Sequence, residues 1–212
     1  MIDVSMIDNN LLKLNFQPAQ VGQIVAVLRN EVTPILQSRK LQIETSEFEG
    51  GRQWIYVDTQ RVTQAIRNVI SNAVKYTPDN GKITISGRML PGFIEVVVED
   101  TGIGISQEHQ SIIFEKFGQV GSVGLHSSGK TKFKGGGPGL GLSIARGILE
   151  AHGGAIWVES PGYDEKTYPG STFHILIPAR TESADPEMTR LFDTLEKKFK
   201  PNVETNTPTH NT

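Results

Sequence analysis

Three polar side chains recur along one side of an expected helix. The run from about Thr59 to Tyr76 places Asn68, Asn72 and Lys75 at positions i, i+4 and i+7, on a single ridge beside an apolar face. Asparagine is a poor helix former, because its amide competes for backbone hydrogen bonds. Two amide oxygens and an ammonium group on one ridge could together bind an anion that carries a metal ion. A solvated polar edge is the alternative interpretation.

A glycine-rich stretch at residues 135–142 could supply N–H groups that bind phosphate. It reads Gly-Gly-Gly-Pro-Gly-Leu-Gly-Leu and opens an expected helix from Leu140 to Ala151. The free N–H groups and the positive dipole end of such a helix attract phosphate. The stretch lacks the Gly-Lys-Ser/Thr ending of a Walker loop, and no strand directly precedes it as the dinucleotide fingerprint requires. Glycines that serve only flexible packing are the alternative.

A second glycine motif, Asp100-Thr101-Gly102-Ile103-Gly104, follows an expected strand. Glycines at alternate positions allow a tight turn that lies close against a flat ligand. A carboxylate at the end of the strand can accept a hydrogen bond from an exocyclic amine, as a site that selects adenine would require. An ordinary Asp-Gly turn is the alternative, and such turns are common.

Length, net charge and composition restrict the class of protein. A chain of 212 residues can hold one well-packed domain plus extensions. Its net charge of −2 gives no electrostatic case for nucleic acid, and the lack of cysteine excludes disulfides and thiolate metal sites. No apolar run approaches the roughly 20 residues of a membrane-spanning helix. We therefore expect a soluble, cytoplasmic chain, which could still derive from a membrane-bound parent.

The elements that must position these motifs are helices and short strands in irregular order. Apolar periodicity predicts helices over Val21–Leu41, Thr59–Tyr76 and Leu140–Ala151. Alternating patterns predict six strands, the first two joined by a turn at Gly50-Gly51. The strands are expected at Leu41–Phe48, Trp54–Val57, Lys82–Arg88, Phe93–Glu99, Ala155–Glu159 and Thr172–Ile177. This order predicts an α+β fold, a two-layer α/β sandwich in which helices cover one face of a mixed, mostly antiparallel sheet.

The chain divides into three parts by composition. Residues 18–180 are expected to form the domain, and residues 181–212 a polar tail or linker with a short helix followed by disorder. Within the domain, residues 118–137 are rich in Gly, Ser and Lys, which is typical of a long functional lid. Residues 1–17 have the apolar rhythm that fits the end of an amphipathic helix and a linker.

Four motifs together resemble those of sensor histidine kinases. Residues 68–76 (Asn-Val-Ile-Ser-Asn-Ala-Val-Lys-Tyr) resemble their N box, and residues 100–104 their first glycine box. Residues 113–117 (Ile-Phe-Glu-Lys-Phe) resemble the F box, and residues 137–142 the second glycine box. The motifs occur in the order of that family, and the likeness covers about residues 21–178. It implies the Bergerat ATP-binding fold, which gyrase, the heat-shock ATPase chaperones and mismatch-repair ATPases share.

The resemblance also implies ligands and roles. Asn72 would hold magnesium through its side-chain oxygen, Asn68 would contact the phosphates or a metal-bound water, and Lys75 would offset phosphate charge. Asn68 and Lys75 are thus the expected catalytic residues. Tyr76 would pack along adenine, whose amine Asp100 would bind. The remaining expected nucleotide contacts are Gly102, Ile103, Gly104, Phe117, Gly137, Gly139, Leu140, Gly141, Leu142 and Thr172, of which Thr172 would support the base beside the aspartate.

Position 68 separates transfer from hydrolysis. The ATP-hydrolysing relatives resemble one another in having Glu there, a base that can activate water, whereas Asn cannot accept a proton at neutral pH. Phosphoryl transfer depends mostly on positioning and charge neutralisation, so the site needs no base of its own. The expected activity is therefore transfer of the ATP γ-phosphoryl group to a histidine.

The expected acceptor histidine does not occur in this chain. In the family it lies on a dimerisation helix, and residues 30–34 (Asn-Glu-Val-Thr-Pro) only faintly resemble its context. The expected partners are ATP, the histidine-bearing dimerisation domain of a homodimeric parent kinase and a response-regulator receiver domain. Two alternatives remain, a non-catalytic nucleotide-binding or interaction module of the same fold and a serine kinase of the anti-sigma type. Which lid lysine reaches the γ-phosphate also stays open among Lys116, Lys130, Lys132 and Lys134.

Overall fold

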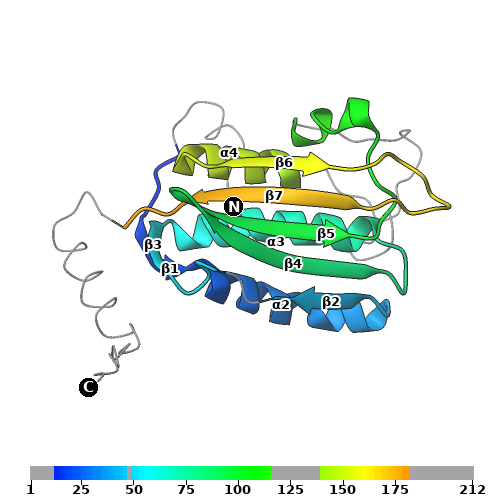
Figure 1. Ribbon diagram of the computed structural model, residues 1–212, viewed down its shortest axis with the longest axis horizontal. Coiled ribbons are helices and arrows are strands. Elements are labelled where there is room, and N and C mark those ends of the chain that lie inside the picture. The colour runs from blue at the N-terminus through cyan, green and yellow to red at the C-terminus, as the bar shows by residue number, and fades with distance from the viewer. Residues whose placement is uncertain (1–11, 47–48, 116–138, 182–212) are drawn as a thin grey trace, which may run out of the picture.

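The computed structural model describes residues 12–46, 49–115 and 139–181 (Figure 1). Three α-helices lie in these ranges, α2 (Val21–Ser38), α3 (Thr59–Tyr76) and α4 (Gly141–His152), with two short 3-10 helices, η1 (Gln107–His109) and η2 (Ile112–Phe114). The expectations for residues 1–11, for the lid with Phe117 and Gly137, and for the tail beyond residue 181 fall outside the described residues. No helix in the described ranges is long and apolar enough to cross a membrane.

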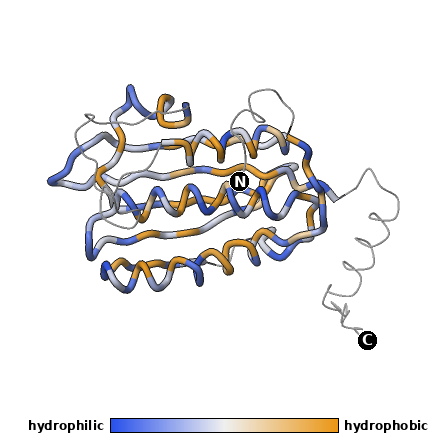
Figure 2. Tube along the Cα trace, turned by 180° about the vertical axis from the view of Figure 1, so that it is seen from behind, coloured by the Kyte–Doolittle hydropathy of each residue, from blue (hydrophilic) through white to orange (hydrophobic). Residues whose placement is uncertain are grey.

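Five strands form the main sheet, in the order β2-β4-β5-β7-β6. Only β2 and β4 run parallel, and the other neighbours are antiparallel. Figures 1 and 2, which view the domain from opposite sides, show α2, α3 and α4 on the same side of this sheet. The α+β class and the two-layer arrangement predicted from the sequence are therefore confirmed. The strands are β2 (Gln42–Thr45), β4 (Lys82–Leu90), β5 (Phe93–Asp100), β6 (Ala155–Glu159) and β7 (Ser171–Pro178).

The turn predicted at Gly50-Gly51 is confirmed, but the strands on either side of it do not pair with each other. β3 (Trp54–Val57) pairs with β1 (Gln17–Gln20) in a separate two-stranded sheet, whereas β2 pairs with β4. Each of the two strands pairs instead with a strand from another part of the chain, and a local turn signal cannot predict such a partner. Gly22, for example, donates its N–H to the carbonyl of Gly51, across 2.8 Å.

The helix α3 has the bounds predicted from its periodicity. Asp58 precedes it and accepts a hydrogen bond from the N–H of Arg61, across 3.1 Å, which satisfies one of the free donors at the start of the helix. Its apolar side is buried against the sheet and the two neighbouring helices. The buried residues of this side are Val62, Ala65, Ile66, Val69, Ile70, Ala73 and Val74. Burial of this face therefore fixes the position of the adjoining edge of α3, which carries the polar ridge.

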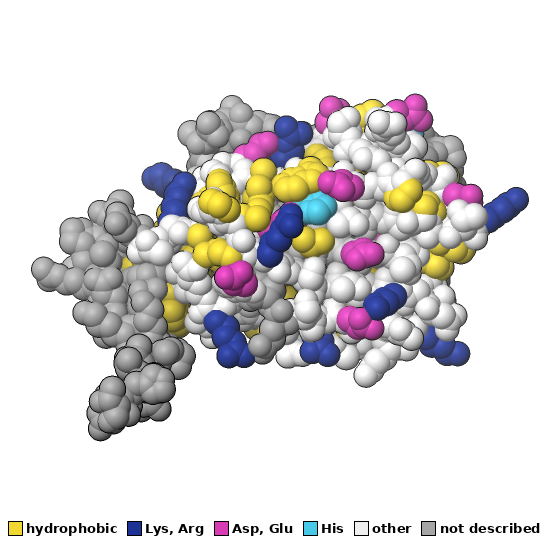
Figure 3. All heavy atoms as spheres, viewed as in Figure 1, with side chains coloured by type: hydrophobic (Ala, Val, Ile, Leu, Met, Phe, Trp, Pro, Cys, Tyr) yellow, Lys and Arg dark blue, Asp and Glu magenta, His cyan; other side chains and the backbone are white. Residues whose placement is uncertain are grey.

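The face of the sheet that points away from the helices carries charged side chains of both signs among hydrophobic ones (Figure 3). On it the Glu95 side chain is 1% exposed, and it bonds both Arg88 and His174. His174 in turn stacks on Trp157, with ring centroids 4.7 Å apart and planes 4° from parallel. The buried carboxylate is therefore paired, as burial of a charge requires. The polar site lies elsewhere, at the edge of the helical layer.

Candidate functional site

The polar ridge of α3 faces the beginning of α4. The side-chain amide of Asn68 donates a hydrogen bond to the backbone carbonyl of Gly141, across 2.9 Å. A Cβ atom added to Gly141 would have Asn68 atoms as its nearest neighbours, from 3.7 Å. The glycine-rich stretch at residues 135–142 therefore ends beside Asn68. Gly139, with a φ of +69°, adopts the left-handed conformation that glycine accommodates without strain just before this helix.

The first turn of α4 begins beside this ridge. Leu140 precedes the helix without a side-chain hydrogen bond to cap it, and its carbonyl accepts from the N–H of Ile144 (3.0 Å) and the hydroxyl of Ser143 (3.0 Å). The leading N–H groups of a helix have no partner within the helix, and the dipole makes this end positive. An anionic group beside Asn68 would therefore meet hydrogen-bond donors here. Leu142, 8% exposed, faces the apolar core.

Asn72 and Lys75 continue the ridge toward the end of α3. Both side chains are half-buried, and the amide of Asn72 makes no hydrogen bond to another described residue. An amide oxygen is a hard ligand of the kind that magnesium accepts, together with waters and phosphate oxygens. The residue therefore fits the role of a single protein ligand to magnesium. The Lys75 ammonium lies 4.8 Å from the centroid of the Tyr76 ring. Its positive charge is therefore located at the end of the polar ridge, next to Tyr76.

Asp100 ends β5 in a buried position next to the last turn of α3. It is 4% exposed, and its Oδ1 accepts a hydrogen bond from the N–H of Gly102 across 2.8 Å. Burial raises the pKa of the Asp100 carboxyl from the ordinary 3.8 to about 7, although the backbone N–H groups of Gly102 and Ser171 favour the carboxylate. A buried acceptor with a perturbed pKa suits recognition of an amine donor, because that donor would stabilise the ionised form.

The loop after Asp100 is packed too tightly for side chains at two of its positions. A Cβ atom on Gly102 would lie 2.6 Å from the carbonyl oxygen of Tyr76, and one on Gly104 would lie 2.0 Å from that of Gly162. The N–H of Ile103, which is 6% exposed, donates to the carbonyl of Tyr76 across 3.2 Å. The glycine motif at residues 100–104 therefore contacts the end of α3, and the glycine-rich stretch at residues 135–142 contacts its middle.

The residue beside Asp100 on the neighbouring strand is Ser171. The register of β5 and β7 pairs Asp100 with Ser171 and Glu99 with Thr172. Because successive side chains alternate between the faces of a sheet, Thr172 lies on the face opposite to that of Asp100. Ser171 instead shares the face of Asp100, and its backbone N–H bonds the Asp100 carboxyl, while the role of Thr172 stays a prediction. The sequence signal for Ser171 is the large apolar residue Phe173. Ser171 lies two positions before Phe173 and therefore on the same, buried face of the strand.

Phe117 and Gly137 lie outside the described residues, as do the four lid lysines. What the structure describes of the F box is its beginning. Phe114 is buried and packs edge-on against Phe173 of β7, with ring centroids 6.3 Å apart. The first residues of the F box are thus anchored in the core.

Comparisons with known proteins agree with this geometry. A family model described as "Histidine kinase-, DNA gyrase B-, and HSP90-like ATPase" matches residues 57–181. The probable sensor kinase SilS of Salmonella typhimurium is 31% identical over 192 residues, which cover 88% of this chain and 35% of that protein. Three curated relatives are matched over 12%, 14% and 35% of their own length.

Two solved structures have the same fold. The catalytic domain of histidine kinase ThkA superposes with a TM-score of 0.64 at 24% identity, covering 78% of this chain and 97% of that one. Histidine kinase ThkA in complex with the response regulator protein TrrA superposes with a TM-score of 0.60 at 23% identity, covering 83% of this chain and 46% of that one. The chain therefore belongs to the family of histidine kinase-, DNA gyrase B- and HSP90-like ATPases and has the catalytic ATP-binding domain of the sensor histidine kinase type.

Proposed function

We propose that this domain binds ATP with magnesium and transfers the γ-phosphoryl group to a histidine on a dimerisation domain that the present chain does not include. The observation that supports this proposal is a pair of contacts made by α3. Asn68 bonds the glycine motif at the start of α4, and Tyr76 bonds the glycine motif after Asp100. The two contacts are about 12 Å apart along the helix at 1.5 Å per residue. That separation suits a nucleotide with its phosphates at one end and its base at the other.

Each half of this site has a proposed task. At the phosphate end, the N–H groups of the first turn of α4 and the Lys75 ammonium would offset negative charge. Asn72 would hold the magnesium ion, which when bound neutralises charge on the phosphate oxygens. At the base end, Asp100 would accept a hydrogen bond from the adenine amine, and Tyr76 and Ile103 would lie along the base. Ser171 would support Asp100 from the neighbouring strand.

The identity of residue 68 supports transfer to a second protein over hydrolysis. The Asn68 amide donates to Gly141, and an amide cannot take a proton from water at neutral pH. Bound ATP would therefore persist until an external nucleophile, the imidazole of a histidine, approaches the γ-phosphorus. The step forms a bond from the imidazole nitrogen to phosphorus, breaks the bond from phosphorus to the bridging oxygen, and releases ADP.

The proposed macromolecular partners follow from this chemistry. A dimerisation domain of the parent kinase would present the histidine, the parent would be a homodimer, and a response-regulator receiver domain would take the phosphoryl group onward. The complex of ThkA with a response regulator supports the last of these partners by analogy. ATP is a cytoplasmic substrate, so the proposal carries a cytoplasmic location with it, whether or not the parent is anchored in a membrane.

The test is phosphorylation in trans. The domain would be mixed with the dimerisation domain of its parent and with ATP labelled in the γ-phosphoryl group, and the product examined for acid-labile, base-stable phosphate. We expect phosphohistidine on the dimerisation domain, and none when its histidine is replaced by Gln or when the kinase domain carries Asn72→Ala. Binding of ATP without any transfer to the verified cognate domain would contradict the kinase assignment and favour a nucleotide-binding module.

A further inference from the structure

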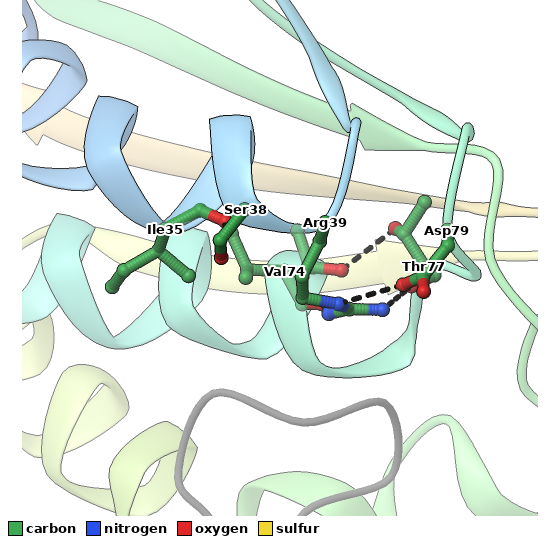
Figure 4. Close-up of polar contacts among 7 residues, drawn as sticks. Ile35, Ser38, Arg39, Val74, Thr77 and Asp79 are labelled. Atoms are coloured by element: carbon green, nitrogen blue, oxygen red, sulfur yellow. Dashed lines mark hydrogen bonds and ion pairs between the residues drawn. The ribbon is translucent and has the colours of Figure 1, made fainter.

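The last turn of α3 is held by a side chain from outside that helix. Arg39, which directly follows α2, is only 8% exposed. Its guanidinium donates from Nη1 to the carbonyl of Val74 and from Nη2 to the carbonyl of Thr77, the latter across 2.7 Å. Its Nε donates to Oδ1 of Asp79 across 2.9 Å (Figure 4). One planar side chain therefore hydrogen-bonds three residues at the end of the helix that carries the polar ridge.

The geometry of these bonds suits arginine in particular. Carbonyls in the last turn of a helix have no partner within it, and the helix dipole makes this end negative. The rigid, always charged fork of arginine satisfies two such carbonyls at once, which a lysine ammonium on a flexible stem does less well. The backbone adds to the grip, because the carbonyl of Arg39 accepts from the N–H of Asn80 across 3.4 Å. The end of α2 and the end of α3 are thus bound to each other.

The gripped turn is the part of α3 that meets the base end of the site. It contains Lys75 and Tyr76, and the carbonyl of Tyr76 accepts from the N–H of Ile103 across 3.2 Å. Arg39 bonds the carbonyl of Val74, two residues before Tyr76, and that of Thr77, directly after it. The position of Tyr76 relative to the loop after Asp100 therefore depends on a residue that lies in neither glycine motif nor in the N box.

We propose that Arg39 is a positioning residue for the nucleotide site, which it serves by fixing the last turn of α3 so that Tyr76 meets the base beside Asp100. This inference rests on the proposed ATP site. Small displacements of positioning groups cause large losses of function, because binding requires several contacts at once. Removal of Arg39 should thus weaken nucleotide binding without removing any group that touches the nucleotide.

The structure offers a matched control on the same two helices. Arg67 of α3 bonds Glu31 of α2 through two contacts of 2.8 and 2.9 Å, with side chains 39% and 46% exposed. This pair also joins α2 to α3, but it lies on the surface and two turns before the gripped end. Asp79→Asn is a second control, because it removes the ion pair at a 63% exposed side chain and leaves both carbonyl contacts of Arg39 in place.

The experiment measures the Kd for ATP with magnesium by calorimetry, at a temperature where circular dichroism shows every variant folded. We expect Arg39→Gln to raise the Kd at least about tenfold, and Arg67→Gln and Asp79→Asn to leave it within about twofold. Should Arg39→Gln fail to fold, Arg39→Lys takes its place, with a rise of about threefold or more because the fork is lost.

A double-mutant cycle separates positioning from general destabilisation. In a Tyr76→Ala background, the further effect of Arg39→Gln on the Kd should shrink to less than about threefold, since the group that it positions is absent. An unchanged Kd for Arg39→Gln, or a full tenfold loss that persists in the Tyr76→Ala background, would overturn the inference while wild-type binding still supports the site. Absence of ATP binding by the wild-type protein would instead contradict the proposed function itself.

Discussion

The side-chain amide of Asn68 on α3 donates to the backbone carbonyl of Gly141, the first residue of α4, across 2.9 Å. This bond joins two motifs that lie 73 positions apart in the chain. It places the polar ridge of one helix beside the start of another, where the leading N–H groups have no partner within the helix. The phosphate end of the proposed site therefore depends on how α3 and α4 pack against each other.

Replacing Asn68 tests this junction. We expect Asn68→Ala to lower the free energy of unfolding by only about 0.5–1.5 kcal/mol, the usual net value of one hydrogen bond. We expect it to weaken ATP binding by about tenfold, because in the proposed site the Asn68 amide would also contact the phosphates. Chemical denaturation and calorimetry measure the two effects. Ser71→Ala, at an exposed position of the same helix, is the control and should change neither; equal losses in both variants would count against a specific role for Asn68.

Gly104 and Gly92 form a matched pair for the close packing of the adenine-side loop. Both have positive φ, +70° and +78°, but a Cβ on Gly104 would meet the carbonyl oxygen of Gly162 at 2.0 Å, whereas one on Gly92 would meet nothing within 4 Å. Alanine at either position costs about 1–2 kcal/mol for the left-handed conformation. We expect Gly104→Ala to cost about 1–3 kcal/mol more through overpacking. Thermal denaturation compares Gly104→Ala with Gly92→Ala. Similar melting temperatures would show that the loop around Gly104 can rearrange to accommodate the added methyl group.

The buried carboxyl of Asp100 predicts a pH dependence with a definite sign. Burial raises its pKa to about 7, above the ordinary 3.8 that applies when the chain is unfolded, so the folded state binds this proton more tightly. The stability that Asp100 contributes is therefore greatest below pH 3.8 and is lost as the pH rises through about 7. Relative to the nucleotide-free wild type, Asp100→Asn should gain on the order of 2 kcal/mol between pH 5 and pH 8.

Denaturation of both proteins at each pH measures this difference, and Glu108→Gln, at an exposed site, is the control. A difference between wild type and Asp100→Asn that stays constant from pH 5 to pH 8 would show that the carboxyl titrates normally. Asp100→Asn should also reduce the preference for ATP over inosine triphosphate, since an amide in place of the carboxylate can donate as well as accept. An unchanged preference would remove Asp100 from the base end of the site.

His152 titrates with the opposite sign. Its Nε2 accepts from the N–H of Asp58 across 3.0 Å and its Nδ1 contacts the carbonyl of Ile148, so the ring is neutral. Burial lowers the pKa of His152 below the ordinary 6.5. The stability that it contributes is present above pH 6.5 and is lost as the pH falls below that value. We expect His152→Gln to show a smaller fall in melting temperature between pH 7.5 and 5.5 than wild type, and an equal fall in both would contradict this role of His152.

The sequence was sufficient for the features that depend on local pattern. The bounds of α3 follow from an apolar period that ends at Thr77-Pro78, and the strand at residues 155–159 follows from alternation. Pairing depends on partners distant in the chain, which is why β1 was not predicted. Its sequence, Gln-Pro-Ala-Gln, has no strand pattern and becomes a strand only by pairing with β3.

The candidate site was predictable to the extent that its residues lie in contiguous motifs. Asn68, Asn72, Lys75 and the two glycine motifs stand out in the sequence by their spacing, and their roles at a nucleotide site stay predictions. Ser171 was missed because alternation alone leaves the face of a residue open until a buried neighbour, here Phe173, fixes the register. Arg39 was missed because its role depends on contacts with residues 35 to 40 positions further along the chain, which no local pattern reveals.

Calorimetric titration with ATP would show whether this domain holds ATP through magnesium at Asn72. Wild type, Asn72→Ala and the control Ser71→Ala would each be titrated with and without magnesium. We predict that wild type and Ser71→Ala bind ATP more tightly when magnesium is present. We predict that Asn72→Ala binds at least about tenfold more weakly and gains little from the metal, because its one protein ligand is gone. Wild-type binding that ignores magnesium, or an Asn72→Ala variant that binds as wild type does, would contradict the account.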